Sequence, residues 1–388
     1  GIDFGLDFSY ANGYPIETKE TIHAIKEKGF YTLRLQVAGS YHVMDKDFTL
    51  DPAFMKQLKK VVDWAIEEDM YVIICEGCCS YYYPQSVDSE KNKWIEEHFF
   101  GAGYNLSKED QNHSEKYLKA FWKQIAETFN NSYDEHLVFE FMNEPLDLTD
   151  HRWNPEKNCA TCIEDTKILN SLNQIALDTI RATGGNNEKR YLMVPTLGQD
   201  FFAIDLPDFK LPEDSATDKL IVSVHSYPMG SNTESLIINY TNQLKNDSII
   251  TPFNTADEIL FKNKIPLAIT EFGCSRWIDL VERMNCAKAF MTEVTKDGRS
   301  CSVTMHDDMA FESYSYFGYM DMENNIWYDD GFVDLLIKMA AKKDISKEEK
   351  YIEDNNFYRV ITHQEKDIGI VELDKLEIIE ILKGDSNE

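Results

Sequence analysis

The 388-residue sequence has few basic residues and no long hydrophobic run. Lys and Arg together number 39 against 68 Asp and Glu, which gives a formal net charge of −29 at pH 7. An acidic surface of this size repels phosphate backbones and anionic lipids. No apolar run reaches the length that crosses a bilayer. We therefore expect neither a nucleic-acid partner nor a membrane partner.

Cysteine is also scarce, with eight residues in the chain. So few cysteines exclude a disulfide scaffold for a protein of this length. Cys75-x-x-Cys78, with Cys79, and Cys159-x-x-Cys162 have a spacing that occurs among zinc ligands. Free or disulfide-bonded loop cysteines are the favoured interpretation of both motifs. We expect no bound metal and no cofactor.

Two further signals are missing. No glycine-rich phosphate loop follows an early strand, which argues against a nucleotide-binding fold. No signal peptide is visible either, because the chain opens directly on strand-like residues 1–6. We interpret the sequence as a trimmed mature form, so this second absence does not argue against export.

What is present is a regular alternation of strand and helix patterns. Such alternation predicts a parallel sheet, and eight units favour closure into a (β/α)8 TIM barrel with long rim loops. We expect this barrel to occupy residues 1–344 as one domain. The predicted strands are 2–8, 31–37, 71–76, 138–142, 191–194, 220–225, 265–272 and 301–305, with 315–321 as a rival for the eighth. The predicted helices are 18–28, 52–69, 114–129, 163–183, 256–262, 278–294 and 331–342.

The last residues, 345–388, form a separate C-terminal appendage in this interpretation. Short strand-like runs occur at 357–362, 368–373 and 376–382. We attach no function to them.

Two of the predicted strands end in a glutamate. The apolar run 138–142 continues into Asn143, Glu144 and Pro145, and the run 265–270 continues into Glu271. In a parallel barrel both carboxyl groups project from the C-terminal rim, where active sites of such barrels are built. Apolar walls raise the pKa of a carboxyl group, which suits a general acid. Two facing carboxylates are the equipment of a glycosidase.

Several segments together resemble glycoside hydrolase family 5, and within it subfamily 4, which includes cellulases, xyloglucanases and lichenases. The resemblance is carried by residues 143–145, 222–227 and 270–273. It extends over most of residues 1–341 in the order of the family, through the matching segments 18–35, 181–195 and 317–339. Any one of these motifs is weak, but several in register are fairly specific.

The resemblance implies a retaining, endo-acting hydrolase of β-1,4-glucan polysaccharides such as cellulose, mixed-linkage glucan or xyloglucan. Glu271 would be the nucleophile, and Glu144 the acid and then the base of a double displacement. Arg34 would hold Glu271 ionised. Asn143 would bind the sugar 2-hydroxyl. A protein of this kind is expected to be a secreted monomer with a polysaccharide or oligosaccharide as its partner.

The resemblance also places His225 and Tyr227 on the rim of the sixth strand, near the acid/base and the nucleophile respectively. Trp277, six residues after Glu271, is the best candidate for a ring that stacks on sugar. Other candidate rings are Tyr81, Tyr82, Tyr83, Trp94 and Trp153.

The sequence departs from the family pattern at three places. The pair of histidines at the end of strand 3 is replaced by residues 74–78, which add Glu76 as a possible substrate-binding carboxylate or a solvated one. The tryptophan after strand 2 is replaced around Ala38, and the tryptophan of strand 8 by Thr304 or His306. These losses favour the alternative of a catalytically impaired, carbohydrate-binding pseudoenzyme of the same fold.

Overall fold

The computed structural model describes residues 1–5, 18–77, 93, 97–148, 155–230, 240–307, 317–322, 324–328 and 330–355. Eight parallel strands follow one another around a closed barrel, in which the first strand pairs with both the second and the eighth. The TIM-barrel prediction is confirmed. The strands are β1 (Ile2–Gly5), β2 (Thr32–Val37), β3 (Tyr71–Glu76), β4 (Leu137–Glu140), β5 (Leu192–Asp200), β6 (Leu220–Ser226), β7 (Leu267–Phe272) and β8 (Cys301–His306).

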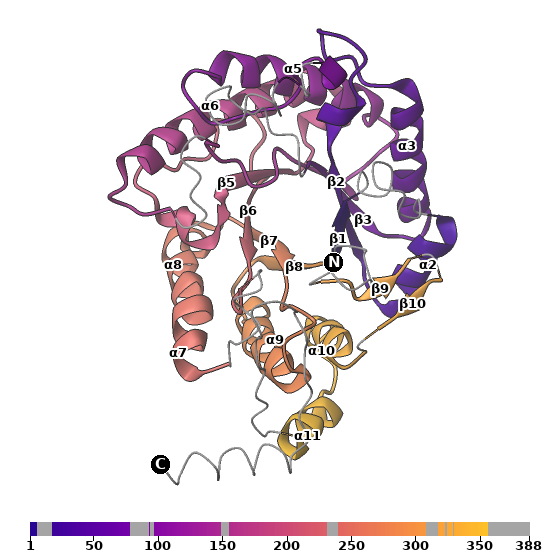
Figure 1. Cartoon of the computed structure of the whole chain (residues 1–388), viewed down its shortest axis with the longest axis vertical. Coiled ribbons are helices and arrows are strands. Elements are labelled where there is room, and N and C mark those ends of the chain that lie inside the picture. The colour runs from indigo at the N-terminus through magenta and orange to yellow at the C-terminus, as the bar shows by residue number, and fades with distance from the viewer. Residues whose placement is uncertain are drawn as a thin grey trace.

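Helices surround the barrel (Figure 1). Their apolar residues are buried against it in one hydrophobic core. Local sequence sets their ends. For example, Thr18 caps the first helix by accepting from the Thr21 N–H, and Gly29 ends it in the left-handed conformation at φ 114°. The main helices are α2 (Lys19–Lys28), α3 (Pro52–Glu67), α5 (Gln111–Thr128), α6 (Ala160–Ala182), α7 (Asn242–Lys245), α8 (Thr251–Ile259), α9 (Leu280–Val294) and α10 (Asp330–Ala340).

The inside of the barrel changes from apolar to polar along the strands. A small apolar cluster of Ile73, Val138, Met193 and Ala268 fills it at one level. Because side chains alternate across a strand, the next inward residues lie two positions further on. On β4 and β7 these are Glu140 and Thr270, both fully buried. The polar level therefore lies between the apolar plug and the C-terminal rim.

The eighth strand is Cys301–His306, close to the predicted 301–305. In the described part of the rival segment, residues 317–321, the strand is β9 (Met320–Asp321), which pairs antiparallel with β10 (Ile326–Trp327) outside the barrel. The fifth strand is longer than predicted and continues past Pro195 to Asp200. This extension carries Gln199 toward the C-terminal rim of the barrel.

The described part of the predicted appendage is a helix, α11 (Ser346–Asp354). It packs on α9 and α10 through the ion pairs Lys288–Glu349 and Lys338–Glu348, at 2.5 and 2.6 Å. The strand-like runs predicted after residue 356 lie outside the described residues. Among the described helices none is both long and apolar enough to span a membrane.

Candidate active site

The two glutamates predicted from the strand ends meet at the C-terminal rim. Glu144 lies in the turn that follows β4, and Glu271 lies on β7. His225 stands between them, with its Nδ1 at 2.8 Å from Glu144 Oε1 and 3.4 Å from Glu271 Oε2. One ligand atom from each of the three residues lies within 4.8 Å of the other two. The barrel thus brings together side chains that are 127 positions apart in sequence.

Three side chains donate hydrogen bonds to Glu271. Arg34 Nη1 and Gln36 Nε2 donate to its Oε1 at 2.9 and 2.8 Å, and the Tyr227 hydroxyl donates to its Oε2 at 2.6 Å. The Glu271 side chain is only 6% exposed. These three donors replace the hydrogen bonds to water that the buried carboxyl group of Glu271 gives up.

Glu144 has a different environment. Its side chain is 23% exposed, and its backbone takes the left-handed conformation at φ 45°. Its N–H donates to Gln199 Oε1 at 2.7 Å. The neighbouring Asn143 accepts from Arg34 Nη2 at its Oδ1, at 2.9 Å, and its carbonyl accepts from the Tyr104 hydroxyl at 2.7 Å. The turn is therefore held through its backbone, while the Glu144 carboxyl remains partly open to solvent.

A third carboxylate, Glu140, lies beneath the pair and was not predicted as a site residue. It is fully buried and accepts from Arg34 Nε at 2.6 Å, Gln199 Nε2 at 2.7 Å and Thr270 Oγ1 at 2.8 Å. Burial raises the pKa of Glu140, but the charge and hydrogen bond of Arg34, with smaller contributions from His225 and Ser223, together outweigh it, so the pKa is lowered. The sequence contained a signal, because an acid between Phe139 and Phe141 in an apolar strand is expected to be buried beside a charged or hydrogen-bonding partner.

Gln199 was missed as well. It is buried, has a left-handed backbone at φ 49°, and uses both ends of its amide. One end donates to Glu140, and the other accepts the N–H of Glu144. Gln199 therefore connects the buried charge network to the backbone of the acid/base candidate.

Comparison with known proteins decides the family. The sequence model of the Cellulase family (glycosyl hydrolase family 5) matches residues 3–305. The chain belongs to glycoside hydrolase family 5.

The relatives of this glycoside hydrolase span most of its length. Endoglucanase 1 of Ruminococcus albus is 31% identical over 331 residues, which cover 84% of this chain and 72% of that protein. A family 5 lichenase from Caldicellulosiruptor sp. superimposes with a TM-score of 0.73 at 27% identity, covering 87% of this chain and 92% of the other. A broad-specificity endoglucanase of subfamily 4 from Ruminococcus champanellensis, with bound cellotriose, gives 0.70 at 27% identity, covering 87% and 96%. These relatives are named as hydrolases and give no support to the pseudoenzyme alternative.

The structure of the family 5 enzyme puts Glu76 on the side of β3 that faces helix α5. Its Oε1 accepts from the Tyr117 hydroxyl at 2.6 Å, and the residue is fully buried. The prediction that the Glu76 carboxylate faces the sugar pocket or solvent is therefore wrong, because the side chain faces α5 and is buried. Strand alternation explains the difference, because Cys75 is the inward residue. The Cys75 sulfur lies 3.3 Å from Arg34 Nη2.

The predicted stacking rings are only partly described. Trp277 is half-buried, and the guanidinium of Arg276 lies 4.8 Å from the centre of its ring. Tyr227 packs against Phe317 with ring centres 5.3 Å apart. His306 Nδ1 lies 3.9 Å from Glu271 Oε2, at the strand that lacks the family tryptophan. The other candidate rings, Tyr81, Tyr82, Tyr83, Trp94 and Trp153, lie outside the described residues.

Glu144, His225 and Glu271 also have the spacing of metal ligands within the described chain. Both oxygens of Glu271 already accept hydrogen bonds, one of them from the Arg34 cation. A metal ion there would face that positive charge and displace those donors. The donor set fits acid–base chemistry better than metal binding.

Proposed function

We propose that this glycoside hydrolase is an endo-acting β-1,4-glucanase that retains anomeric configuration through a double displacement. The observation that carries the proposal is the short gap between the two carboxyl groups. An oxygen of Glu144 and an oxygen of Glu271 lie within 4.8 Å of each other. Retaining glycosidases hold their carboxyl groups about 5–5.5 Å apart, whereas inverting enzymes need about 6.5–9.5 Å to admit a water.

In the first step Glu271 attacks the anomeric carbon while Glu144 gives its proton to the leaving glycosidic oxygen. The attack consumes the negative charge of Glu271, which becomes an ester oxygen. Arg34 then still faces the carboxylate of Glu140 at 2.6 Å, so its positive charge stays compensated through the step. The buried Glu140 therefore keeps the site electrically balanced while Glu271 is esterified.

In the second step Glu144, now a carboxylate, takes a proton from the water that attacks the sugar ester. This role requires a carboxyl group that exchanges protons with incoming water. The partial exposure of Glu144 and the 2.8 Å contact of its Oε1 with His225 Nδ1 support the assignment. Asn143, whose Oδ1 is fixed by Arg34, is the proposed ligand of the sugar 2-hydroxyl.

The proposed substrates are soluble β-1,4-linked and mixed-linkage glucans. Support comes from the relatives named as endoglucanases and a lichenase. A neutral polysaccharide also suits a protein with a net charge of −29, because no ionic attraction or repulsion enters binding. We further propose that the enzyme acts as a secreted monomer, because polymers of this kind do not enter cells.

The test is a panel of hydroxyethyl-cellulose, lichenan, xyloglucan and glucomannan, assayed for reducing ends and viscosity with wild type and Glu271→Gln. We expect viscosity to fall early relative to reducing-end release, as in internal cleavage, and the variant to lose roughly 10⁴-fold in kcat or more. Proton NMR of the first product from a cello-oligosaccharide should show the β-anomer. A first product of α configuration would rule out retention. Equal, near-zero signals from both proteins on every polysaccharide would leave the carbohydrate-binding pseudoenzyme.

A further inference from the structure

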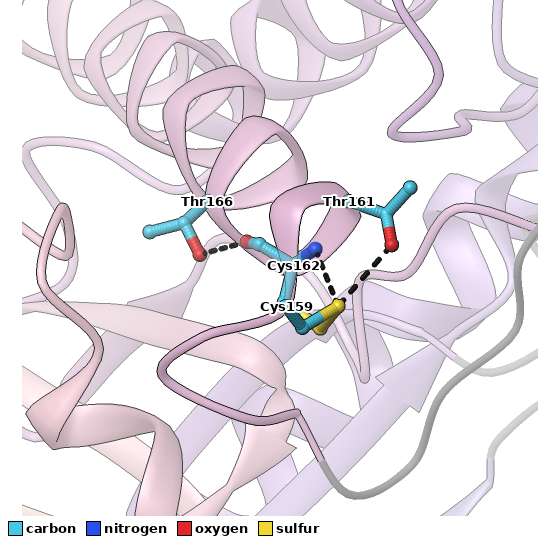
Figure 2. Close-up of a disulfide and its surroundings, with 4 residues drawn as sticks. All are labelled: Cys159, Thr161, Cys162 and Thr166. Carbon is cyan, nitrogen blue, oxygen red and sulfur yellow. Dashed lines mark hydrogen bonds between the residues drawn. A yellow bond between two sulfur atoms is a disulfide. The ribbon is translucent and has the colours of Figure 1, made fainter.

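Cys159 and Cys162 form a disulfide at the start of α6 (Figure 2). The other described cysteines, Cys75, Cys274, Cys286 and Cys301, are free thiols. We propose that the Cys159–Cys162 pair is a redox-active site that exchanges with dithiols, with Cys159 as the reacting sulfur. This inference is independent of the hydrolytic function.

The start of α6 is built to stabilise a thiolate at Cys159. This residue is the N-cap of a 23-residue helix, and its sulfur accepts the N–H of Cys162 at 3.1 Å. The hydroxyl of Thr161 lies 3.2 Å from the same sulfur. The first turn of a long helix also presents a partial positive charge. Thiolates in Cys-x-x-Cys motifs at helix N-termini are stabilised in this way and become reactive at neutral pH.

The two sulfurs differ in access. Cys159 is half-buried, whereas Cys162 is 1% exposed. An incoming thiolate therefore reaches Cys159, and Cys162 is protected as the leaving sulfur. Figure 2 shows that the Thr166 hydroxyl donates to the Cys162 carbonyl, at 2.6 Å. This contact involves neither sulfur, so we expect the first turns of α6 to remain helical when the disulfide is reduced.

A purely structural role explains the bridge poorly. Loop-closure stabilisation by a disulfide grows with the number of residues in the loop. The sequence separation here is 3, within a single turn of one helix. The bridge does not connect separate elements of the barrel. We therefore expect its contribution to the free energy of unfolding to be small for a disulfide.

The exchange proceeds in two displacements. A thiolate of the external dithiol attacks Cys159 Sγ and forms a mixed disulfide. The Cys159–Cys162 bond breaks, and its electron pair leaves on Cys162 Sγ, which takes a proton from water. The second thiolate of the dithiol then attacks its own partner sulfur in the mixed disulfide and expels Cys159 as a thiolate. Two electrons pass from the dithiol to the pair, and the dithiol becomes a disulfide.

The test uses the folded full chain, equilibrated without denaturant in mixtures of reduced and oxidised dithiothreitol at graded potentials. Free thiols are blocked with N-ethylmaleimide, and labelling at Cys159 and Cys162 is counted by peptide mass spectrometry. We expect both cysteines to gain label together and reversibly, while circular dichroism stays constant. Reduction that requires denaturant would overturn the proposal and leave a structural staple.

Single variants assign the reacting sulfur. In Cys162→Ser the remaining Cys159 should react with iodoacetamide about tenfold faster than the remaining Cys162 does in Cys159→Ser, because only the former has the exposed, helix-capped position. Cys301→Ser is the control and should leave the redox equilibrium of the pair unchanged. Equal alkylation rates in the first two variants, or faster reaction at Cys162, would contradict the assignment.

Discussion

Glu271 and Glu144 are the same side chain in two different surroundings. Glu271 is 6% exposed and accepts from a guanidinium, an amide and a phenol. Glu144 is 23% exposed and is contacted by a histidine nitrogen, while its backbone is held by Gln199. Pairs of carboxyl groups whose environments differ in this way take different roles in proton transfer and attack. The barrel thus holds Glu271 through its side chain and Glu144 mainly through its backbone.

The largest expected effect comes from removing the positive charge of Arg34, which lies beneath Glu144 and Glu271. Arg34→Met leaves Glu140 and Glu271 without their charged donor, since Arg34 contacts both at 2.6 and 2.9 Å. We expect the free energy of unfolding to fall by about 3–5 kcal/mol, as for other broken buried ion pairs. Chemical denaturation measures the loss.

Arg181→Met is the matched control, because Arg181 pairs with the buried Asp214 at 2.7 Å away from the two glutamates. It should also destabilise the fold but preserve kcat in the folded protein. If Arg34→Met kept wild-type kcat, the proposed charge balance in the site would be wrong.

Glu144 and Glu271 can be distinguished by the substrates on which their variants still carry out the first step. Glu144→Ala should lower kcat on a β-glucan by about 10²–10⁴-fold, because the leaving oxygen is no longer protonated. An aryl cellobioside with an acidic phenol needs no such proton, so its first step should survive in this variant. Stopped-flow release of the phenol should show a burst followed by slow turnover. Glu271→Gln should show no burst, and a burst there would reverse the two assignments.

The residues around these two glutamates show how much of the fold and of the site can be predicted from the sequence alone. Strand periodicity and the motifs at 143–145 and 270–273 were enough to predict the barrel and the meeting of Glu144 with Glu271. Glu140 and Gln199 were missed, because which side chains share one level inside a barrel depends on the register between strands. Glu76 was misplaced for a simpler reason. Its strand was predicted correctly, but a one-residue change in alternation decides whether a side chain faces the barrel or a helix.

Gln199 allows a sharper test of how Glu144 is positioned. Gln199→Met removes the donor to Glu140 and the acceptor of the Glu144 N–H, while keeping the length of the side chain. We expect kcat to fall about 10–100-fold with little change in KM, in keeping with the loss of a hydrogen bond to a charged group. The alkaline limb of the pH–rate profile should also move, because Glu144 must carry its proton in the first step.

Gln243→Met, in the exposed helix α7, is the control for this substitution and should leave both kinetic constants and the profile unchanged. A Gln199→Met variant that is less stable but has an unchanged pH profile would show a structural role alone.

The carboxyl group of Asp200 gives the smallest expected effect, because its pKa shift comes from burial opposed by backbone N–H groups. Burial raises the pKa of Asp200 to about 6, although the N–H groups of Phe202 and Ala203 oppose the rise. The folded state therefore binds this proton more tightly than the unfolded chain, whose aspartates titrate near about 3.9. The contribution of Asp200 to stability should decline as pH rises from about 4 to about 6.

Asp200→Asn keeps an oxygen that can accept from Phe202 and removes the charge. We expect the variant to be more stable than wild type at pH 7 by about 1–2 kcal/mol, and to lose this advantage near pH 4. Urea denaturation at the two pH values measures the difference. A gain of equal size at both pH values would show that the charge is not its cause.

The segment that follows β8 contacts the barrel at its C-terminal rim and at its N-terminal end. Phe317 packs on Tyr227 beside Glu271, and the Tyr319 hydroxyl donates to the Cys274 carbonyl. Trp327 stacks on Phe30 at the entry to β2, with ring centres 5.4 Å apart. Inserting or deleting a residue here would therefore shift the phenol that donates to Glu271, even when the change is made at the far end near Trp327. Attempts to graft loops onto this scaffold should spare this stretch.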